Sequence, residues 1–223
     1  TKLQTLNLRG TKITDAGLVH LKGLSSLQKL DLLYGLKITD AGLVHLKGLQ
    51  LTSLVITNGA KTDLGLKHYL AALETHTALN LVRWRITDAG LVHLKGLTEL
   101  QELYLIETEI TDAGLVNLKG MTKLQELNLM STPITGTGLV HLKGLTNLQT
   151  LSLGSNKITG AGLIHLKELT NLQGLTLVGS ITDAGLVHLK GLSKLQTLFV
   201  RSNQTTGVGL AHLKGLTGLQ TLN

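Results

Sequence analysis

The sequence predicts an α/β solenoid, a curved right-handed coil in which a parallel sheet is backed by short helices. The first observation is a repeat. The segment from Ile13 to Leu24 returns unchanged at Ile38 to Leu49, at Ile86 to Leu97 and at Ile181 to Leu192. Self-similarity at a fixed period of this length is the signature of a repeat architecture. The other two observations are a strand-like pattern and a helix-like pattern within every unit.

The strand-like half of each unit reads Leu-x-x-Leu-x-Leu. Its first position holds Leu3, Leu27, Leu51, His76, Leu100, Leu124, Leu148, Leu172, Leu195 and Leu219. We therefore expect one domain over residues 1–223, with about nine 24-residue repeats and a partial tenth. The last two leucines alternate with a polar residue, as in Leu6-Asn7-Leu8, which is the period of a strand with one buried face.

The helix-like half follows after a short turn. Leucines at 18, 21 and 24 are spaced by three, as on one face of a short helix. Thr14 stands where an N-cap belongs, and Asp15 follows in the first turn, where the helix dipole favours a negative charge. Gly23 is suited to end the helix.

A glycine stands at the position of Gly17 in all nine units. A glycine inside a helix costs about 1 kcal/mol relative to alanine, so its repetition predicts a close approach to a neighbouring backbone. Strands lie ~4.8 Å apart and packed helices ~8–10 Å apart. The stack should therefore curve, with the strands on the concave face and the helices on the convex face.

These motifs resemble those of a known family. A Thr or Asn stands three residues after several openings, at Thr11, Thr108, Thr132, Asn156 and Asn203. The opening with this residue resembles the leucine-rich repeat over essentially the whole chain. The Ile-Thr-Asp-x-Gly-Leu-x-x-Leu half is similar to the subtype of F-box-type, bacterial and invertebrate immune-type repeat arrays. The resemblance implies a horseshoe that binds macromolecules through its concave face. Unlike the F-box subtype, the chain has no cysteine and no F-box-like segment.

The composition narrows the classes of protein to which the chain could belong. No cysteine means no disulfide and no cysteine-rich cap, and no apolar run reaches 18 residues, so we expect no membrane span. Neither end carries an evident capping unit of the kind that solenoids need. Three interpretations remain open: a fragment of a longer protein, an array without caps, or copies that associate end to end.

The third and fourth repeats depart most from the pattern. Lys61 replaces an isoleucine, Leu64 an alanine, Tyr69 a leucine and His76 a core leucine. These changes could form a bump on one rim, but we favour drift in a tolerant loop.

The outward positions of the strands predict a binding surface. Val82, Ile106 and Met130 are consecutive apolar residues in one outward column, with Tyr104 beside them. An exposed apolar patch with aromatic and arginine anchors is typical of a protein interface. The predicted contact residues are Leu33, Tyr34, Val82, Arg83, Trp84, Tyr104, Ile106 and Met130.

A lysine column offers a second surface beside the buried leucines, on the convex side. It consists of Lys22, Lys47, Lys95, Lys119, Lys143, Lys167, Lys190 and Lys214, and it supplies much of the net charge of +7. Such a stripe attracts acidic glycans, lipid headgroups, nucleic acids or a microbial surface, as in innate pattern recognition. We favour the simpler interpretation of this column, a solvated face that was copied with each duplication.

A histidine column runs two residues before the lysines, but we predict no metal site. Corresponding residues on adjacent helices lie ~8–10 Å apart, whereas zinc needs bonds of ~2.0–2.1 Å. We find no nucleophile with a matching base and no glycine-rich phosphate loop, so we expect no cofactor and no enzyme activity. The sequence predicts a binding scaffold for a protein partner. The alternatives are the acidic-polymer surface and a structural or engineered array without a ligand.

Overall fold

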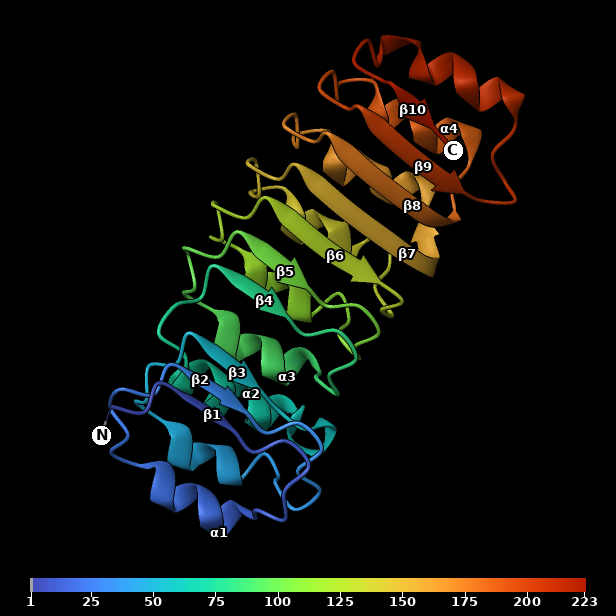
Figure 1. Ribbon diagram of the computed structural model, residues 1–223. Coiled ribbons are helices and arrows are strands. Elements are labelled where there is room, and N and C mark those ends of the chain that lie inside the picture. Colours follow the sequence, from blue (N-terminus) through green and yellow to red (C-terminus); the bar gives the residue numbers. More distant parts are fainter. Residues whose placement is uncertain (1) are drawn as a thin grey trace. The chain divides into compact units, whose positions relative to one another are not determined.

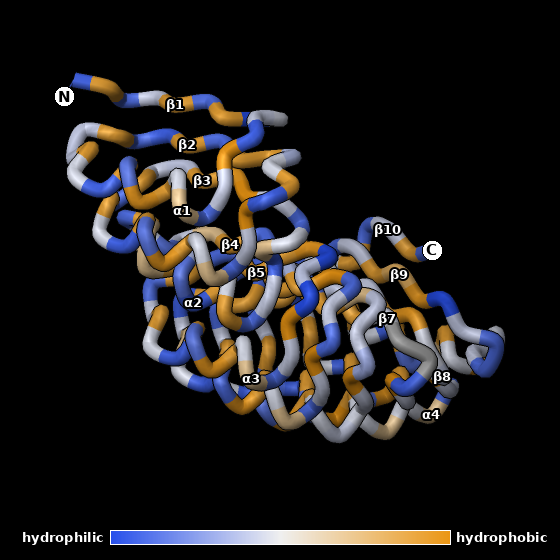
Figure 2. The backbone as a smooth tube through the Cα atoms, turned by 90° about the horizontal axis from the view of Figure 1, so that it is seen from below, coloured by the Kyte–Doolittle hydropathy of each residue, from blue (hydrophilic) through white to orange (hydrophobic). Residues whose placement is uncertain are grey.

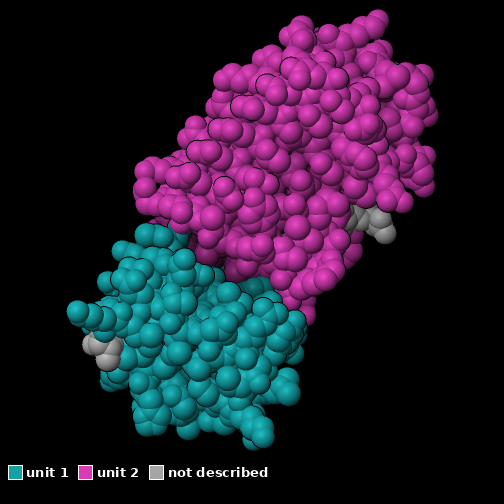
Figure 3. All heavy atoms as spheres, in the orientation of Figure 1, with its two compact units in different colours: residues 1–76, 84–93 teal, residues 77–83, 94–223 magenta. Residues whose placement is uncertain are grey.

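The protein is described from a computed structural model over residues 2–223, apart from the side chains of residues 155 and 156. The chain forms two compact units, residues 1–76 with 84–93 and residues 77–83 with 94–223, called unit 1 and unit 2 (Figure 3). Strand pairing divides in the same way, into a three-stranded sheet and a seven-stranded sheet. The division falls among the repeats whose sequence departs most from the consensus, where the regular strand register is interrupted.

The sheet of unit 1 is parallel and is made of three-residue strands. They are β1 (Thr5–Asn7), β2 (Lys29–Asp31) and β3 (Ser53–Val55). The α-helices are α1 (Asp15–Leu18), α2 (Asp63–Ala72) and α3 (Asp88–Leu91). The 3₁₀ helices are η1 (Val19–Leu21), η2 (Gly42–Leu46) and η3 (Asn58–Ala60), and η4 (Val92–Leu94) leads from unit 1 into unit 2.

The sheet of unit 2 is also parallel, and its strands lie in sequence order. They are β4 (Ala78–Asn80), β5 (Glu102–Tyr104), β6 (Glu126–Met130), β7 (Thr150–Thr159), β8 (Gly174–Ser180), β9 (Thr197–Arg201) and β10 (Thr221–Leu222). The helical segments are η5 (Gly114–Leu118), η6 (Gly138–Leu142), η7 (Gly160–Leu166), α4 (Asp183–Leu186), η8 (Val187–Leu189) and η9 (Gly207–Gly215).

The repeat period sets the strand register. Leu127 of β6 pairs with Leu151 of β7, which pairs with Leu175 of β8, and all three side chains are buried. Along β6 buried residues alternate with half-buried ones, as the sequence predicts for a strand with one buried face. Apolar and polar residues alternate along the strands in Figure 2. In each unit the helical segments cover the leucine-bearing face of the sheet and leave the other face open (Figure 1).

The predicted short helix is present, and much of it is 3₁₀ helix. A leucine spacing of three matches a helix of 3.0 residues per turn better than one of 3.6. Gly23 ends the first helical segment with φ of +91°, which confirms its predicted role. Thr14 is the N-cap residue of α1, as predicted, although its side chain makes no capping hydrogen bond. Thr62 does cap α2, accepting from the N–H of Gly65 at 3.1 Å.

Asp15 lies in the first turn of α1, as predicted, and its carboxylate also bonds to the next repeat. It accepts from the backbone N of Thr39 at 2.8 Å and from Thr39 Oγ1 at 2.7 Å. A Cβ added to Gly42 would overlap this carboxylate. The repeated glycine is therefore required by close packing between repeats, as its recurrence predicts. Among the described residues no helix is long and apolar enough to cross a bilayer.

Candidate functional site

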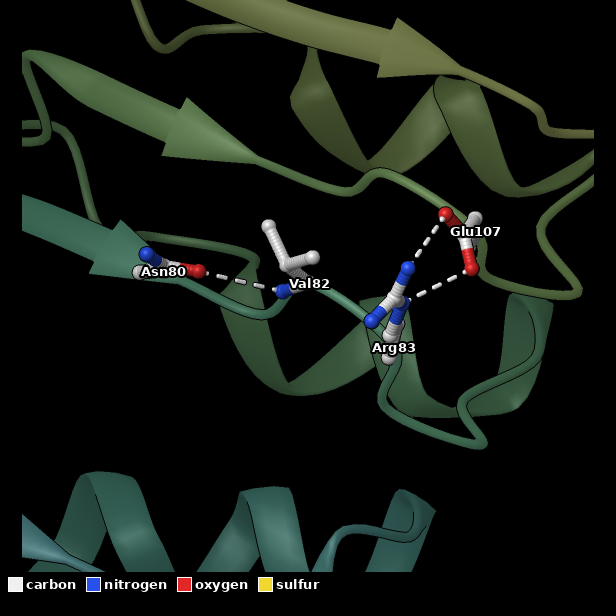
Figure 4. Close-up of polar contacts among 4 residues, drawn as sticks. All are labelled: Asn80, Val82, Arg83 and Glu107. Atoms are coloured by element: carbon white, nitrogen blue, oxygen red, sulfur yellow. Dashed lines mark hydrogen bonds and ion pairs between the residues drawn. The ribbon is translucent and has the colours of Figure 1, made fainter.

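The strand exits of unit 2 are shaped by polar side chains that turn the backbone. Asn80 Oδ1 accepts from the N–H of Val82 at 3.2 Å (Figure 4), and Asn128 Oδ1 accepts from the N–H of Met130 at 3.1 Å. Asn and Asp commonly make this local bond two residues onward. The hydrogen bond fixes the backbone of the apolar residue that stands two positions after the asparagine.

An apolar ladder lies just beyond these turns on the open face of the sheet. The N–H of Arg83 donates to the carbonyl of Ile106 at 2.9 Å, and the N–H of Glu107 donates to the carbonyl of Met130 at 3.1 Å. These bonds place Val82, Ile106 and Met130 side by side at one strand spacing, ~4.8 Å. All three side chains are half-buried.

The ladder continues through Gly154 and Val178. Strand register pairs Met130 with Gly154, and Gly154 with Val178. A Cβ added to Gly154 would overlap the sulfur of Met130, so the Met130 side chain lies over the glycine backbone. Val178 then pairs with Arg201, which gives the row a cationic end. We call Val82, Ile106, Met130, Gly154 and Val178 the apolar ladder.

A hollow of about 760 Å³ lies at the far end of the apolar ladder. It is lined by Val178, Gly179, Ser180, Arg201, Ser202 and Asn203. Ser202 Oγ closes one side by donating to the carbonyl of Ile181 at 2.8 Å. The hollow therefore combines an apolar wall with a guanidinium, a pairing that suits an anchoring side chain or terminus of a protein partner.

Carboxylates flank the apolar ladder on the strand-entry side. Glu102 of β5 and Glu126 of β6 pair in register. The hydroxyl of Tyr104 donates to Glu102 Oε2 at 3.2 Å. Partial burial and the two carboxylates raise the pKa of Tyr104 to about 12. Two carboxylates in register repel each other. Within the described residues neither of them has a lysine or arginine at ion-pair distance.

An ion pair flanks the ladder on the strand-exit side. Arg83 Nε lies 2.9 Å from Glu107 Oε2, and its Nη2 lies 3.3 Å from Oε1 (Figure 4). This hydrogen-bonded contact raises the pKa of Arg83 and lowers the pKa of Glu107. Both residues have left-handed backbones, with φ of 60° and 55°, at equivalent positions of turns that lie 24 residues apart. The pair is exposed, so it shapes the rim rather than stabilising the core.

The predicted contact residues fall in both units. Unit 2 holds Val82, Arg83, Tyr104, Ile106 and Met130, and unit 1 holds the others. In unit 1 Leu33 is half-buried and Tyr34 is 60% exposed. Arg9 lies over the Tyr34 ring, with its Cζ 4.9 Å from the centroid. Tyr34 and Arg9 therefore form a small surface of their own within unit 1.

Trp84 is a correction, because it is 4% exposed and not at the surface. Its ring packs edge-on against Tyr69, with centroids 5.3 Å apart at 75°. Trp84 stands three residues after Leu81, and buried Thr108 stands three residues after Leu105. The burial of Trp84 could have been predicted from this spacing, because the residue three positions after the last leucine of a strand points inward. Asn156, which the sequence analysis places at the same position, lies outside the described side chains.

Phe199 is the residue that the sequence reasoning left out. It is 37% exposed and pairs in register with Thr176, on the row that Tyr104 occupies in β5. Its position in the outward column two residues before Arg201 could have indicated it. Together with Val178 it extends the candidate surface of unit 2 toward the hollow.

Comparisons with known proteins agree with this geometry. Family profiles described as leucine rich repeat match residues 122–180 and residues 1–21. The chain has the leucine-rich repeat fold. Curated protein sequences give no match.

Three solved structures resemble this leucine-rich repeat array. Internalin C2 of Listeria monocytogenes is 26% identical, with a TM-score of 0.56 over 98% of this chain and 79% of that chain. Internalin F of the same organism is 23% identical, with a TM-score of 0.67 over 99% and 67%. A chain in the octameric complex of Latrophilin 3, Unc5D and FLRT2 is 20% identical, with a TM-score of 0.61 over 98% and 74%. In that complex FLRT2 contributes the leucine-rich repeat.

The predicted lysine column lies on the helical side of the array. In unit 2 the column comprises Lys95, Lys119, Lys143, Lys167, Lys190 and Lys214, and Lys22 and Lys47 lie in unit 1. Lys119, Lys143 and Lys190 follow directly on helical segments at the C-cap. In the part of the chain that the structure describes, no lysine of the column makes an ion pair.

The neighbouring histidines are poorly placed to add charge to the lysine column. The Nδ1 atoms of His141 and His165 are buried without a hydrogen-bond partner. Burial and the nearby Lys143 lower the pKa of His165. Among the described residues no three histidines, aspartates or glutamates are grouped so that they could hold a metal ion.

Proposed function

We propose that this leucine-rich repeat array is a binding scaffold rather than an enzyme, and that a protein partner docks on the open face of unit 2. The observation that carries the proposal is the apolar ladder. Val82, Ile106 and Met130 lie in consecutive strands on the face without helices, and each is half-buried. Aliphatic side chains in a row on an open face favour a partner that covers them.

The flanking charges suggest the chemistry of the partner. Glu102 and Glu126 lie in register without a cation at ion-pair distance among the described residues. A basic group of the partner would offset their repulsion. Aliphatic side chains of the partner would lie on Ile106 and Met130. FLRT2, a protein of the same fold, occurs in a complex with Latrophilin 3 and Unc5D, which is in keeping with this use of the fold.

The test is selection of peptides or proteins on the intact chain, followed by affinity measurement on two double variants. Ile106→Arg with Met130→Arg places two charges in the apolar ladder. Val116→Arg with Val140→Arg makes the same change at exposed valines in the helical segments η5 and η6.

We expect the ladder variant to lose at least about 30-fold in affinity, as truncation of a hot spot does, and the helical-face variant to bind like the parent. Selected ligands should combine apolar and basic residues. Equal binding by both variants would remove the apolar ladder from the interface. Unfolding of the ladder variant would instead place Ile106 and Met130 in the core.

A second candidate function is capture of an acidic polymer by the lysine column. The observation in its favour is the lack of any ion pair to these lysines among the described residues. Binding of heparin or anionic vesicles should weaken steeply with salt, and Lys119→Ser with Lys167→Ser should reduce the slope of that dependence. A salt-independent affinity would exclude this function. A chain that captures neither proteins nor acidic polymers would be a structural array.

A further inference from the structure

A polar groove runs along the strand-entry edge of unit 2, away from the apolar ladder. It has a volume of about 500 Å³. Two columns of the repeat line it: Gln101, Gln125, Gln149 and Gln173, and, two residues before a glutamine, Lys123, Asn147, Asn171 and Lys194. Every lining side chain is therefore an amide or an ammonium group, and none is a carboxylate or an aliphatic group.

The glutamine column is held in register by its own backbone. The N–H of Gln125 donates to the carbonyl of Gln101 at 2.8 Å, and the N–H of Gln149 donates to Gln125 at 2.7 Å. The N–H of Gln173 continues the series to Gln149 at 2.8 Å. Their side chains are exposed, and within the described residues their amide groups have no hydrogen-bond partner. Each amide offers two donors and an acceptor, so the column presents a row of free polar groups ~4.8 Å apart.

The second column is already ordered by hydrogen bonds. Asn147 Nδ2 donates to the carbonyl of Thr122 at 2.7 Å, and Asn171 Nδ2 donates to the carbonyl of Thr146 at 2.8 Å. Lys194 Nζ donates to Asn171 Oδ1 at 2.7 Å. These bonds fix one wall of the groove before any ligand arrives, which lowers the entropy cost of binding.

The charge of the groove is small despite its two lysines. Lys123 Nζ lies 2.6 Å from Glu99 Oε2, so the carboxylate neutralises it at that end. Only the ammonium of Lys194 remains without an ion pair among the described residues. The groove thus suits a ligand rich in neutral groups that both donate and accept hydrogen bonds. Hydroxyl groups of a sugar chain have this property.

The spacing distinguishes a sugar chain from a peptide. In an extended peptide, groups on one side repeat every two residues, at ~6.6 Å, which falls out of step with strands ~4.8 Å apart. In an extended β-1,4-linked chain successive sugars are turned over, so groups on one side repeat every two sugars, a length close to two strand spacings, ~9.6 Å. We propose that the groove binds an extended, β-1,4-linked neutral glycan, with about one sugar to each repeat from Gln101 to Gln173.

The experiment is calorimetric titration of the full chain with cellohexaose. Maltohexaose has the same hydroxyl groups on a curved chain and serves as the ligand control. Gln125→Ala with Gln149→Ala removes two central amides. Gln4→Ala with Gln28→Ala makes the same change at exposed residues of the same repeat position in unit 1, outside the groove.

We expect cellohexaose to bind in preference to maltohexaose, and the Gln125/Gln149 variant to bind about tenfold more weakly or not at all, because several hydrogen bonds are lost. The Gln4/Gln28 variant should bind like the parent. Binding should persist at 1 M salt, where the Debye length is ~3 Å, which separates this site from the lysine column. The far-ultraviolet circular dichroism of both variants should match the parent, because only exposed side chains change.

Absence of cellohexaose binding by the parent would overturn the proposal. So would equal binding by the parent and the Gln125/Gln149 variant, or equal binding of maltohexaose. Preference for a serine-rich hexapeptide over cellohexaose would assign the groove to a peptide and also overturn it. None of these results depends on the apolar ladder, so they leave the proposed protein-binding function to its own test.

Discussion

Asp63 receives two hydrogen bonds from Thr87, the residue that begins the helical half of the next repeat. The backbone N–H of Thr87 donates to Oδ1 at 2.8 Å, and its hydroxyl donates to Oδ2 at 2.7 Å. In unit 2 Asp183 accepts in the same way from Thr206, at 2.7 Å and 2.6 Å. In these repeats one carboxylate therefore ties a helix start to the repeat before it, and the same bond joins Asp15 to Thr39 and Asp112 to Thr135.

Three repeats of unit 2 replace the carboxylate by glycine, at Gly136, Gly160 and Gly207, and at the first two the contact with the next repeat is between backbones. A Cβ on Gly138 would overlap the side chain of Asp112, whereas a Cβ on Gly162 would overlap the backbone of Gly136. A side chain can move aside, but a backbone in a packed stack cannot. We expect Gly162→Ala to lower the free energy of unfolding by about 1–3 kcal/mol, and Gly138→Ala to lower it less.

The control for these glycine variants is Gly191→Ala, where an added Cβ has nothing within 4 Å. It should change the free energy of unfolding by less than about 0.5 kcal/mol in urea titrations. If Gly162→Ala were as stable as Gly191→Ala, the close backbone approach would be wrong.

Two of these carboxylates, Asp112 and Asp183, have a lowered pKa and predict a loss of stability in acid. Partial burial alone would raise the pKa of Asp112, but hydrogen bonds from Thr135, Thr137 and Gly138 outweigh it and lower the pKa. A lowered folded pKa stabilises the fold above the unfolded value of ~3.9, and that contribution is lost as pH falls through the folded value. The melting temperature should therefore be level near neutral pH and fall below about pH 4.

Thr135→Val tests the source of the acid sensitivity, because it removes the hydroxyl donor and keeps the backbone donor. The pKa of Asp112, followed by NMR of its carboxyl carbon, should rise in this variant. The fall in melting temperature below about pH 4 should become shallower. An unchanged Asp112 titration would show that the Thr135 hydroxyl does not hold the carboxylate.

The repeat period was enough to predict the parallel strands, the leucine core and the glycine contacts. The strands and the core follow from period-two and period-three leucines with a spacing of 24 residues, and the glycine contacts follow from the recurrence of a glycine inside the helical half. The role of Asp15 could not be predicted in the same way, because a residue in the first turn of a helix is also well placed for the helix dipole. Only the stacking geometry brings its carboxylate to Thr39, 24 residues away. The interrupted sheet likewise depends on how two irregular repeats pack, and sequence spacing does not determine that packing.

The candidate surface was predicted in part. The outward column led to Ile106 and Met130, and their half-buried positions on the open face agree with it. Phe199 was not predicted, because it lies in the neighbouring row and is not part of the consecutive aliphatic residues. The polar groove at the strand-entry edge of unit 2 was not predicted, for another reason. Its residues are repeated in nearly every unit, and repetition alone does not distinguish a binding row from a solvated edge.

Ser131 has a left-handed backbone, with φ of 56°, at the turn position that Gly10 occupies in the first repeat with φ of 68°. A non-glycine residue in this region costs ~1–2 kcal/mol, whereas glycine adopts it freely. Glycine also gives the unfolded chain more freedom, which offsets part of the gain. We expect Ser131→Gly to raise the free energy of unfolding by roughly 0.5 kcal/mol. A loss of stability in urea titrations would contradict the left-handed conformation at this turn.

Trp84 and Tyr69 make the final prediction, since both replace the usual repeat residues and pack against each other. Burial raises the pKa of Tyr69 and leaves only 4% of Trp84 exposed. Trp84→Ala should therefore lower the free energy of unfolding by about 3–5 kcal/mol, whereas Trp84→Phe should lose less. Because Trp84 is the one tryptophan of the sequence, its fluorescence reports on this site directly. Emission should be blue-shifted and poorly quenched by iodide. Ready quenching, together with an unchanged stability of Trp84→Ala, would return Trp84 to the surface, where the sequence analysis predicted it.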